Sequence, residues 1–162
     1  MFQVGILTCS DRGAQGERED TSALAIREML PAEFRVVHYQ VVPDEQEAIT
    51  AVLVDWCDGS WVDLIFTTGG TGLTPRDVTP EATLAVIERL VPGIAEAMRA
   101  AGLAKTPHAM LSRAVAGVRR RTLIINLPGS PKAVRENLAV VLPALPHAID
   151  KIKGADQECG SP

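Results

Sequence analysis

Glycines, threonines and an aspartate gather in the segment TTGGTGLTPRDVTPEAT, residues 67–83, which follows the apolar run VDLIF. Glycine lets the backbone approach a ligand closely, and threonine offers a hydroxyl group that binds phosphate oxygens. The segment is not a P-loop, because no Gly-Lys-Ser/Thr follows, and it is not GxGxxG, because Pro75 stands where the last glycine belongs. We therefore predict an anion-binding loop of another kind, in which Gly69, Gly70 and Gly72 let the backbone approach the ligand and Thr67, Thr68 and Thr71 offer hydroxyl groups. The alternative is a tight strand–helix connection that needs these glycines for its conformation.

Two aspartates near these glycines indicate a metal site. Asp77 lies in the same segment, and Asp44 lies in VPDE, after an earlier apolar run. Each also has a structural interpretation, Asp77 as a solvated turn residue and Asp44 as the N-cap of the next helix, with Glu47 completing a capping box. Two carboxylates beside phosphate-binding glycines suit Mg²⁺, which binds a few carboxylates together with substrate phosphates. Since no Ser-His-Asp or Cys-His arrangement is visible, we expect no covalent nucleophile.

The elements that must position these residues are short apolar runs alternating with helical patterns, which predict an α/β fold. We expect one domain over residues 1–153, a three-layer sandwich with a mostly parallel sheet flanked by helices, and a flexible tail over 154–162. Ligands bind such sheets beyond the carboxyl ends of the strands, where the glycine segment, TCSDRG, VPDE and NLPGSPK all lie. The expected strands are 3–8, 35–42, 62–66 and two within 111–126 joined by a glycine-containing turn. The expected helices are 21–30 with Thr21 as cap, one from Asp44, one from Thr79 and Pro80 to about 90, one from Pro92, and a last one ending near 153, with a mobile loop over 9–20.

The composition excludes several classes of function. The 162 residues carry a net charge of −4 and 4% aromatic residues, so neither a basic surface nor stacking platforms for nucleic acid are expected. The three cysteines are widely spaced, which argues against a disulfide framework or a zinc site and suits a cytoplasmic protein with reduced thiols. No signal pattern or membrane-spanning run is visible. Small molecules and other proteins are the expected partners.

The joint occurrence of TTGGTG, TPRDVTPEAT, INLPGSPKAV and the upstream VVPDE resembles the molybdopterin adenylyltransferase (MogA-like) family, which includes the G domains of gephyrin and of its plant counterpart. The similarity covers residues 3–153. The resemblance implies a compact α/β fold, a homotrimer, and a Mg²⁺-dependent reaction in which molybdopterin and ATP give adenylyl-molybdopterin and pyrophosphate. A separate domain or protein then inserts molybdenum.

The resemblance also implies roles for individual residues. The family's catalytic aspartates correspond to Asp44 and Asp77, which are also the Mg²⁺ ligands that we expect. Its glycine loop corresponds to residues 68–72, and further substrate-binding positions are Ser10, Asp11, Ser112, Pro128, Gly129 and Ser130. The alternative is a MoaB-like carrier that binds molybdopterin without catalysis, and the intact Pro75, Arg76 and Asp77 favour the enzyme. Without the resemblance, the residues fit a mononucleotide-binding protein of any kind.

Overall fold

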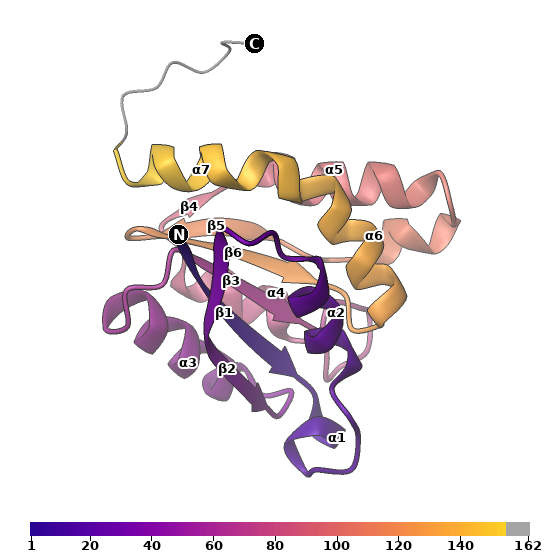
Figure 1. Cartoon of the computed structure of the whole chain (residues 1–162). Helices are drawn as coiled ribbons and strands as arrows, with labels where there is room; N and C mark the ends of the chain where they lie inside the picture. The colour runs from indigo at the N-terminus through magenta and orange to yellow at the C-terminus, as the bar shows by residue number, and fades with distance from the viewer. Residues whose placement is uncertain (155–162) are drawn as a thin grey trace.

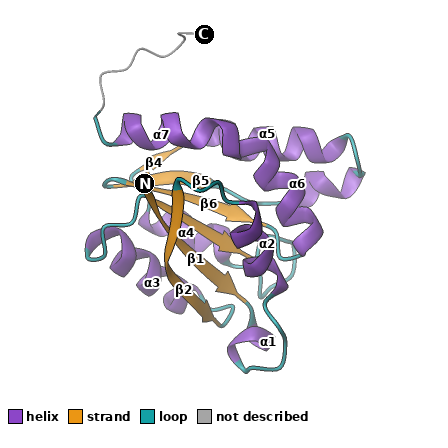
Figure 2. Cartoon of the chain, in the orientation of Figure 1, coloured by secondary structure: helices purple, strands orange, loops and turns teal. Residues whose placement is uncertain are grey.

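The computed structural model describes residues 1–154 and contains a six-stranded sheet with helices on both faces (Figures 1 and 2). In the strand order β2-β1-β3-β6-β5-β4, the first four strands are parallel, β5 pairs antiparallel with β6, and β4 pairs antiparallel with β5. The predicted α/β sandwich with a mostly parallel sheet is confirmed. The predicted tail, 154–162, lies outside the described residues apart from Gly154. The strands are β1 (Phe2–Cys9), β2 (Phe34–Val42), β3 (Leu64–Thr68), β4 (Arg89–Leu90), β5 (Ala116–Arg119) and β6 (Thr122–Leu127).

Alternate residues of the central strands pack against different helices. In β1, Val4 and Ile6 belong to the core on one face of the sheet, whereas Leu7 belongs to the core on the other. Because both faces are covered, all five residues of β3 are buried. The first face is covered by α2 (Thr21–Met29), α5 (Pro92–Leu103), α6 (Pro131–Val141) and α7 (Leu145–Ile152), and the second by α3 (Gln46–Asp58) and α4 (Thr79–Val86) (Figure 1).

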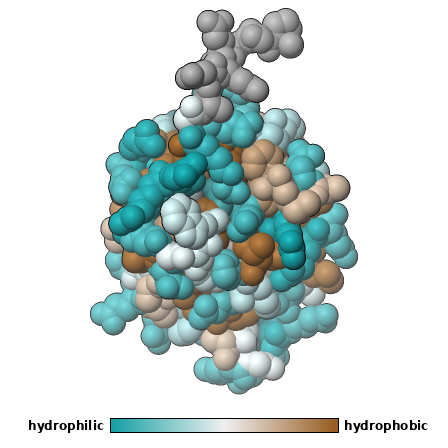
Figure 3. Space-filling view, turned by 60° about the vertical axis from the view of Figure 1, so that its left-hand side comes forward, coloured by the Kyte–Doolittle hydropathy of each residue, from teal (hydrophilic) through white to brown (hydrophobic). Residues whose placement is uncertain are grey.

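The surface is mixed in character. Figure 3 shows a face on which hydrophilic residues predominate and hydrophobic residues are scattered among them. Large exposed apolar side chains come from many different elements, among them Leu24 of α2, Trp61 before β3 and Leu103 of α5. Within residues 1–154, no helix combines the length and the apolar character that a membrane span needs.

Two predicted boundaries in the second half of the chain were wrong. The helix from Thr79 ends at Val86 rather than near residue 90, because the residues that follow pair with the sheet edge as β4, where Val91 N–H donates to Ala116 O (2.9 Å). The hairpin between β5 and β6 does not turn at a glycine. It turns at Arg120, which adopts the left-handed backbone conformation with φ +51°.

The loop after β1 is more ordered than predicted. Residues 9–20 contain the short helix α1 (Asp11–Ala14) where the sequence indicated a mobile loop. Asp20, not Thr21, caps α2, since its carboxylate accepts a hydrogen bond from Ala23 N–H (3.0 Å). An aspartate directly before the threonine takes the capping position because its side chain reaches the free N–H groups of the first turn.

Candidate active site

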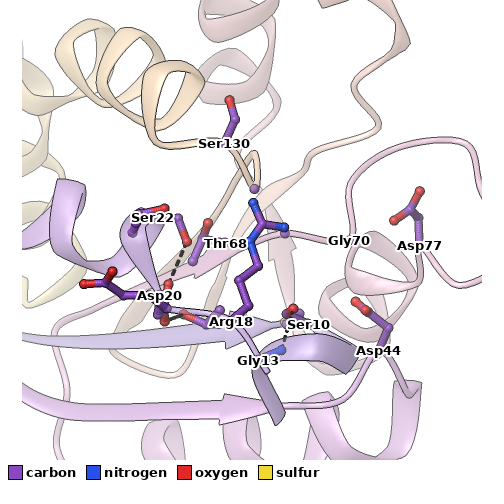
Figure 4. Close-up of a pocket in the computed structure, with 16 residues that line it drawn as sticks. Ser10, Gly13, Arg18, Asp20, Ser22, Asp44, Thr68, Gly70, Asp77 and Ser130 are labelled. Atoms are coloured by element: carbon purple, nitrogen blue, oxygen red, sulfur yellow. Dashed lines mark hydrogen bonds between the residues drawn. The ribbon is translucent and has the colours of Figure 1, made fainter. Parts of the chain in front are cut away.

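A cavity of about 300 Å³ lies beyond the carboxyl ends of β1, β3 and β6 (Figure 4). Its walls come from the loops that follow β1, β2, β3 and β6, the expected place for a ligand in a parallel sheet. Figure 4 shows Asp44 and Asp77 at one side of the cavity and Asp20 and Ser22 at the other. Residues from distant parts of the sequence therefore meet here.

The loop after β3 enters the cavity through a bend at two glycines with left-handed backbone, Gly69 (φ +92°) and Gly70 (φ +68°). A Cβ on Gly69 would lie 2.4 Å from the Cys9 carbonyl oxygen, and one on Gly70 would lie 2.3 Å from Thr79 Oγ1. Thr79 fixes the bend, because its hydroxyl donates to Gly69 O (2.9 Å) and its N–H donates to Gly70 O (3.2 Å). Both the backbone conformation and the available space require glycine at these positions.

Asp44 and Asp11 join the loops that follow β2 and β1. Asp11 N–H donates to Asp44 Oδ2 and Asp44 N–H donates to Asp11 Oδ1, each at 3.0 Å. The predicted capping box is wrong, since Glu45 occupies the N-cap position of α3 and no side chain caps that helix. Burial raises the pKa of Asp44, as do the charges of Asp11 and Asp77, although the Asp11 N–H acts in the opposite direction. The Asp44 carboxylate thus faces the cavity among other acidic groups.

Asp77 closes a turn and keeps one carboxylate oxygen available. Its Oδ2 accepts hydrogen bonds from Thr74 N–H (2.9 Å) and Thr74 Oγ1 (2.8 Å), and Oδ1 has no partner among the described residues. Arg76, next to it, binds Asp11 through two hydrogen bonds of 2.7 and 3.0 Å, and these hydrogen bonds lower the pKa of Asp11. Within residues 1–154, Asp44 and Asp77 form no ion pair of their own.

Asp20 forms the opposite side of the cavity. Its carboxylate accepts four hydrogen bonds, from Thr8 Oγ1 (2.5 Å), Tyr39 OH (2.7 Å), Ser22 Oγ (2.9 Å) and Ala23 N–H (3.0 Å). Burial acts to raise the pKa of Asp20, but the four hydrogen bonds outweigh it and the pKa is lowered. Asp20 is therefore charged near neutral pH and occupies the N-terminus of α2.

The cavity offers neither a reactive thiol nor a complete metal site. Cys9 lines it, but burial raises the pKa of this thiol to about 12, against a hydrogen bond with Thr79 that acts to lower it. The thiol is protonated at neutral pH and is a poor nucleophile. No group of three or more His, Cys, Asp or Glu side chains in the described part of the chain is arranged to hold a metal ion by itself.

Comparison with known proteins assigns the chain to a family. Residues 5–147 match the family described as a probable molybdopterin binding domain. The chain belongs to this family. The structure of the molybdopterin biosynthesis enzyme MoaB from Thermus thermophilus is similar to this molybdopterin-binding domain, with a TM-score of 0.91 and 61% identity over 95% of this chain and 98% of that one.

Curated relatives make the assignment more specific. The domain is 47% identical to a molybdopterin adenylyltransferase of Helicobacter pylori, over 94% of this chain and 89% of that protein. It is 49% identical to gephyrin of Dictyostelium discoideum, over 92% of this chain and 22% of that protein. The predicted membership of the molybdopterin adenylyltransferase family is thereby confirmed.

Most of the predicted site residues of this molybdopterin-binding domain meet at the cavity. Those that line it are Ser10, Asp44, Thr68, Gly69, Gly70, Asp77, Gly129 and Ser130. Asp11, Thr71, Gly72 and Pro128 do not line the cavity but contact the loops that do, as when Thr68 Oγ1 donates to Pro128 O (2.7 Å). Ser112 is not part of the lining, and its hydroxyl accepts a hydrogen bond from Ala114 N–H (3.3 Å).

Charged residues at and around the cavity were not predicted from the sequence, among them Arg18, Glu19, Asp20 and Arg113. Figure 4 shows the Arg18 side chain extending into the cavity, and Arg18 is the cation among the described residues that line it. The role of Asp20 could have been predicted from the sequence, because an aspartate before Thr-Ser at a helix start is a strong cap. No local pattern predicts the role of Arg113, since its partners, Gly72 and Asp77, lie some 40 residues earlier in the chain.

Proposed function

We propose that the chain transfers the adenylyl group of ATP to molybdopterin, giving adenylyl-molybdopterin and pyrophosphate. The observation that carries the proposal is the cavity in which the glycine bend at Gly69 and Gly70 faces two carboxylates, Asp44 and Asp77. A backbone cradle beside two carboxylates suits a triphosphate accompanied by Mg²⁺. The name of the Helicobacter pylori relative, molybdopterin adenylyltransferase, supports this reaction over other uses of a nucleotide.

In the proposed step, a phosphate oxygen of molybdopterin attacks the α-phosphorus of ATP. One P–O bond forms there, and the bond from the α-phosphorus to the oxygen that bridges it to the β-phosphate breaks, with the electron pair leaving on pyrophosphate. The protein supplies no nucleophile, in agreement with the protonated state of Cys9. Catalysis then rests on holding the two substrates in line and on compensating the charge of the phosphates.

Three features of the cavity can compensate phosphate charge. Arg18 offers a guanidinium group. In the glycine bend, Gly69 N–H already donates to Leu127 O (3.2 Å), so the bend offers the backbone N–H of Gly70. The start of α6 offers the positive end of a helix dipole, and Ser130 caps this helix by accepting a hydrogen bond from Ala133 N–H (3.2 Å). The start of α2 is already occupied by the charged Asp20. We therefore infer that the phosphates bind between the glycine bend and α6, away from α2.

The two carboxylates fit the ligands that Mg²⁺ prefers. Asp44 Oδ1 and Asp77 Oδ1 accept no hydrogen bond within residues 1–154, and Asp11 N–H holds the other Asp44 oxygen in place (3.0 Å). Two carboxylates leave the remaining ligand positions to substrate phosphates and water, as is usual for this ion. When bound, Mg²⁺ would supply the positive charge that lets phosphates approach these carboxylates.

A MoaB-like carrier that binds molybdopterin without adenylylating it is the alternative, and it would use the same cavity. The gephyrin relative is far longer than this chain, which supports the proposal that a further domain or protein inserts molybdenum after adenylylation. The homotrimer and the cytoplasmic location stay predictions.

The experiment that tests the function incubates the protein with molybdopterin, ATP and Mg²⁺ and measures pyrophosphate and adenylyl-molybdopterin. In Asp77→Asn, the amide oxygen can still accept the bonds from Thr74, but the charge is lost. We expect turnover to fall by about 100-fold or more while molybdopterin affinity changes little. The matched control is Asp58→Asn, which removes a carboxylate paired with Arg119 outside the cavity. Molybdopterin binding without any pyrophosphate from the wild-type protein would establish the carrier instead, and full turnover in Asp77→Asn would refute the role of Asp77.

A further inference from the structure

The loop that carries Asp77 lies on the surface and has little apolar packing of its own. All four residues from Leu73 to Arg76 are exposed, including the side chain of Leu73. A segment with few buried contacts opens easily unless polar contacts hold it. The position of the Asp77 carboxylate therefore depends on polar contacts, which are the bonds from Arg76 to Asp11 within the loop and the contacts that bind its two ends.

Arg113 binds both ends. Its Nε donates to Gly72 O (2.7 Å), just before the exposed residues, and its Nη2 donates to Asp77 O (2.6 Å), just after them. Its backbone N–H donates to Thr71 O (2.9 Å), and its Nη1 forms an ion pair with Glu81 in the first turn of α4. One guanidinium group thus joins the start of the loop, its end and the helix that follows.

The backbone on either side of Arg113 is held by a second arginine, Arg99. Arg99, on α5, donates to Ser112 O (3.2 Å) and Ala114 O (3.0 Å), the carbonyl groups on either side of Arg113. The backbone around Arg113 is therefore fixed to a helix that packs in the hydrophobic core through Ala95 and Met98. This chain of contacts connects the exposed loop to the rigid part of the fold.

We propose that Arg113 is a positioning residue for the reaction: it sets the place of the Asp77 carboxylate in the cavity without touching substrate. The inference rests on the proposed function, because that function gives Asp77 its role in the reaction and Arg113 positions Asp77. A misplacement of about 1 Å in a catalytic group lowers the rate by up to about 100-fold. Three donors pointing in fixed directions are required here, which a planar guanidinium provides and a lysine ammonium does not.

The experiment uses Arg113→Lys and Arg113→Met, with Arg119→Met as the matched control. Arg119 makes a similar set of bonds, two to the Asp58 carboxylate and one to Val86 O (2.9 Å), but lies outside the cavity. The first measurement is amide hydrogen exchange over residues 71–78, which does not depend on enzymatic activity. We expect about tenfold faster exchange in both Arg113 variants and no change there in Arg119→Met.

The second measurement is steady-state adenylylation as a function of Mg²⁺. We expect Arg113→Met to lower kcat by about 10- to 100-fold and to raise the Mg²⁺ concentration for half-maximal rate, while the Kd for molybdopterin changes less than about threefold. Glu81→Gln keeps the two bonds from Arg113 to backbone carbonyl groups, so its kcat should fall less than that of Arg113→Met. A purely structural role would lower stability equally in Arg113→Met and Arg119→Met and would leave the Mg²⁺ dependence unchanged.

The outcomes separate this inference from the proposed function. Unchanged exchange over residues 71–78 in both Arg113 variants overturns the positioning role whether or not the protein adenylylates molybdopterin. Unchanged kcat and Mg²⁺ dependence in an active protein also overturn it. A wild-type protein that makes no adenylyl-molybdopterin overturns the function, and exchange alone then decides whether Arg113 holds the loop. If Arg113→Met fails to fold, the milder Arg113→Lys provides the same comparisons.

Discussion

The glycine bend at the cavity allows a quantitative prediction for Gly69→Ala. At φ +92° an alanine is strained, which costs about 1–2 kcal/mol. The added Cβ would also lie 2.4 Å from the backbone oxygen of Cys9, and since backbone cannot rotate away as a side chain can, overpacking adds about 1–3 kcal/mol. We therefore expect Gly69→Ala to lower the free energy of unfolding by about 2–5 kcal/mol.

The chain contains a matched control for this substitution. Gly16 has a similar backbone conformation, φ +74°, but nothing lies within 4 Å of the position that its Cβ would occupy. Gly16→Ala should therefore show the backbone cost alone, about 1–2 kcal/mol. Both free energies are measured by urea unfolding of the two variants beside the wild type, followed by tryptophan fluorescence. If Gly69→Ala is no less stable than Gly16→Ala, the close approach of the two loops is not what requires glycine at position 69.

Two aspartates at the cavity should respond to pH in opposite directions. The folded-state pKa of Asp20 is lowered, so its charge stabilises the fold above the usual aspartate pKa and this contribution is lost as pH falls through the lowered value. Asp20→Asn should cost about 1–3 kcal/mol at pH 7, and urea unfolding at pH 7 and pH 3 should show the cost shrinking in acid. The pKa of Asp44 is raised, so its charged form disfavours the fold as pH rises through the raised value. Asp44→Asn should raise the thermal midpoint at pH 7 and give no gain at pH 3, and a lower midpoint at pH 7 would contradict the cost of burying this charge beside Asp11 and Asp77.

The elements of the sheet and the loops at its carboxyl edge could be predicted because each is determined by residues that are neighbours in the sequence. Burial on both faces makes a strand such as β3 begin with the apolar run Leu64–Phe66, and glycines at 69 and 70 mark a bend that other residues resist. The helix caps failed by one residue. Asp44 with Glu47 matches a capping box in every local respect, yet the reciprocal hydrogen bonds with Asp11, 33 residues away, determine where the Asp44 side chain points.

The contacts that complete the site could not be predicted for the same reason. Ser112 was named from the family resemblance, but it is Arg113, the next residue, that reaches the Asp77 loop. Nothing in the spacing between residues 72 and 113 specifies this contact, which follows only when the chain returns to the carboxyl edge of the sheet. Arg18 was missed similarly, since its loop offers no periodic pattern.

The charges around the cavity bear on whether the protein is an enzyme or a carrier. Asp11 is compensated by Arg76, and Asp20 by four hydrogen bonds, but Asp44 and Asp77 form no ion pair within residues 1–154. Burial first, and then the charges of Asp11 and Asp77, raise the pKa of Asp44, so its charged form is disfavoured in the free protein. A carrier for molybdopterin, which itself bears a phosphate, would bind more tightly without two carboxylates that repel its ligand. A protein that binds Mg²⁺ together with a nucleotide needs them, so the pair favours adenylylation over silent binding.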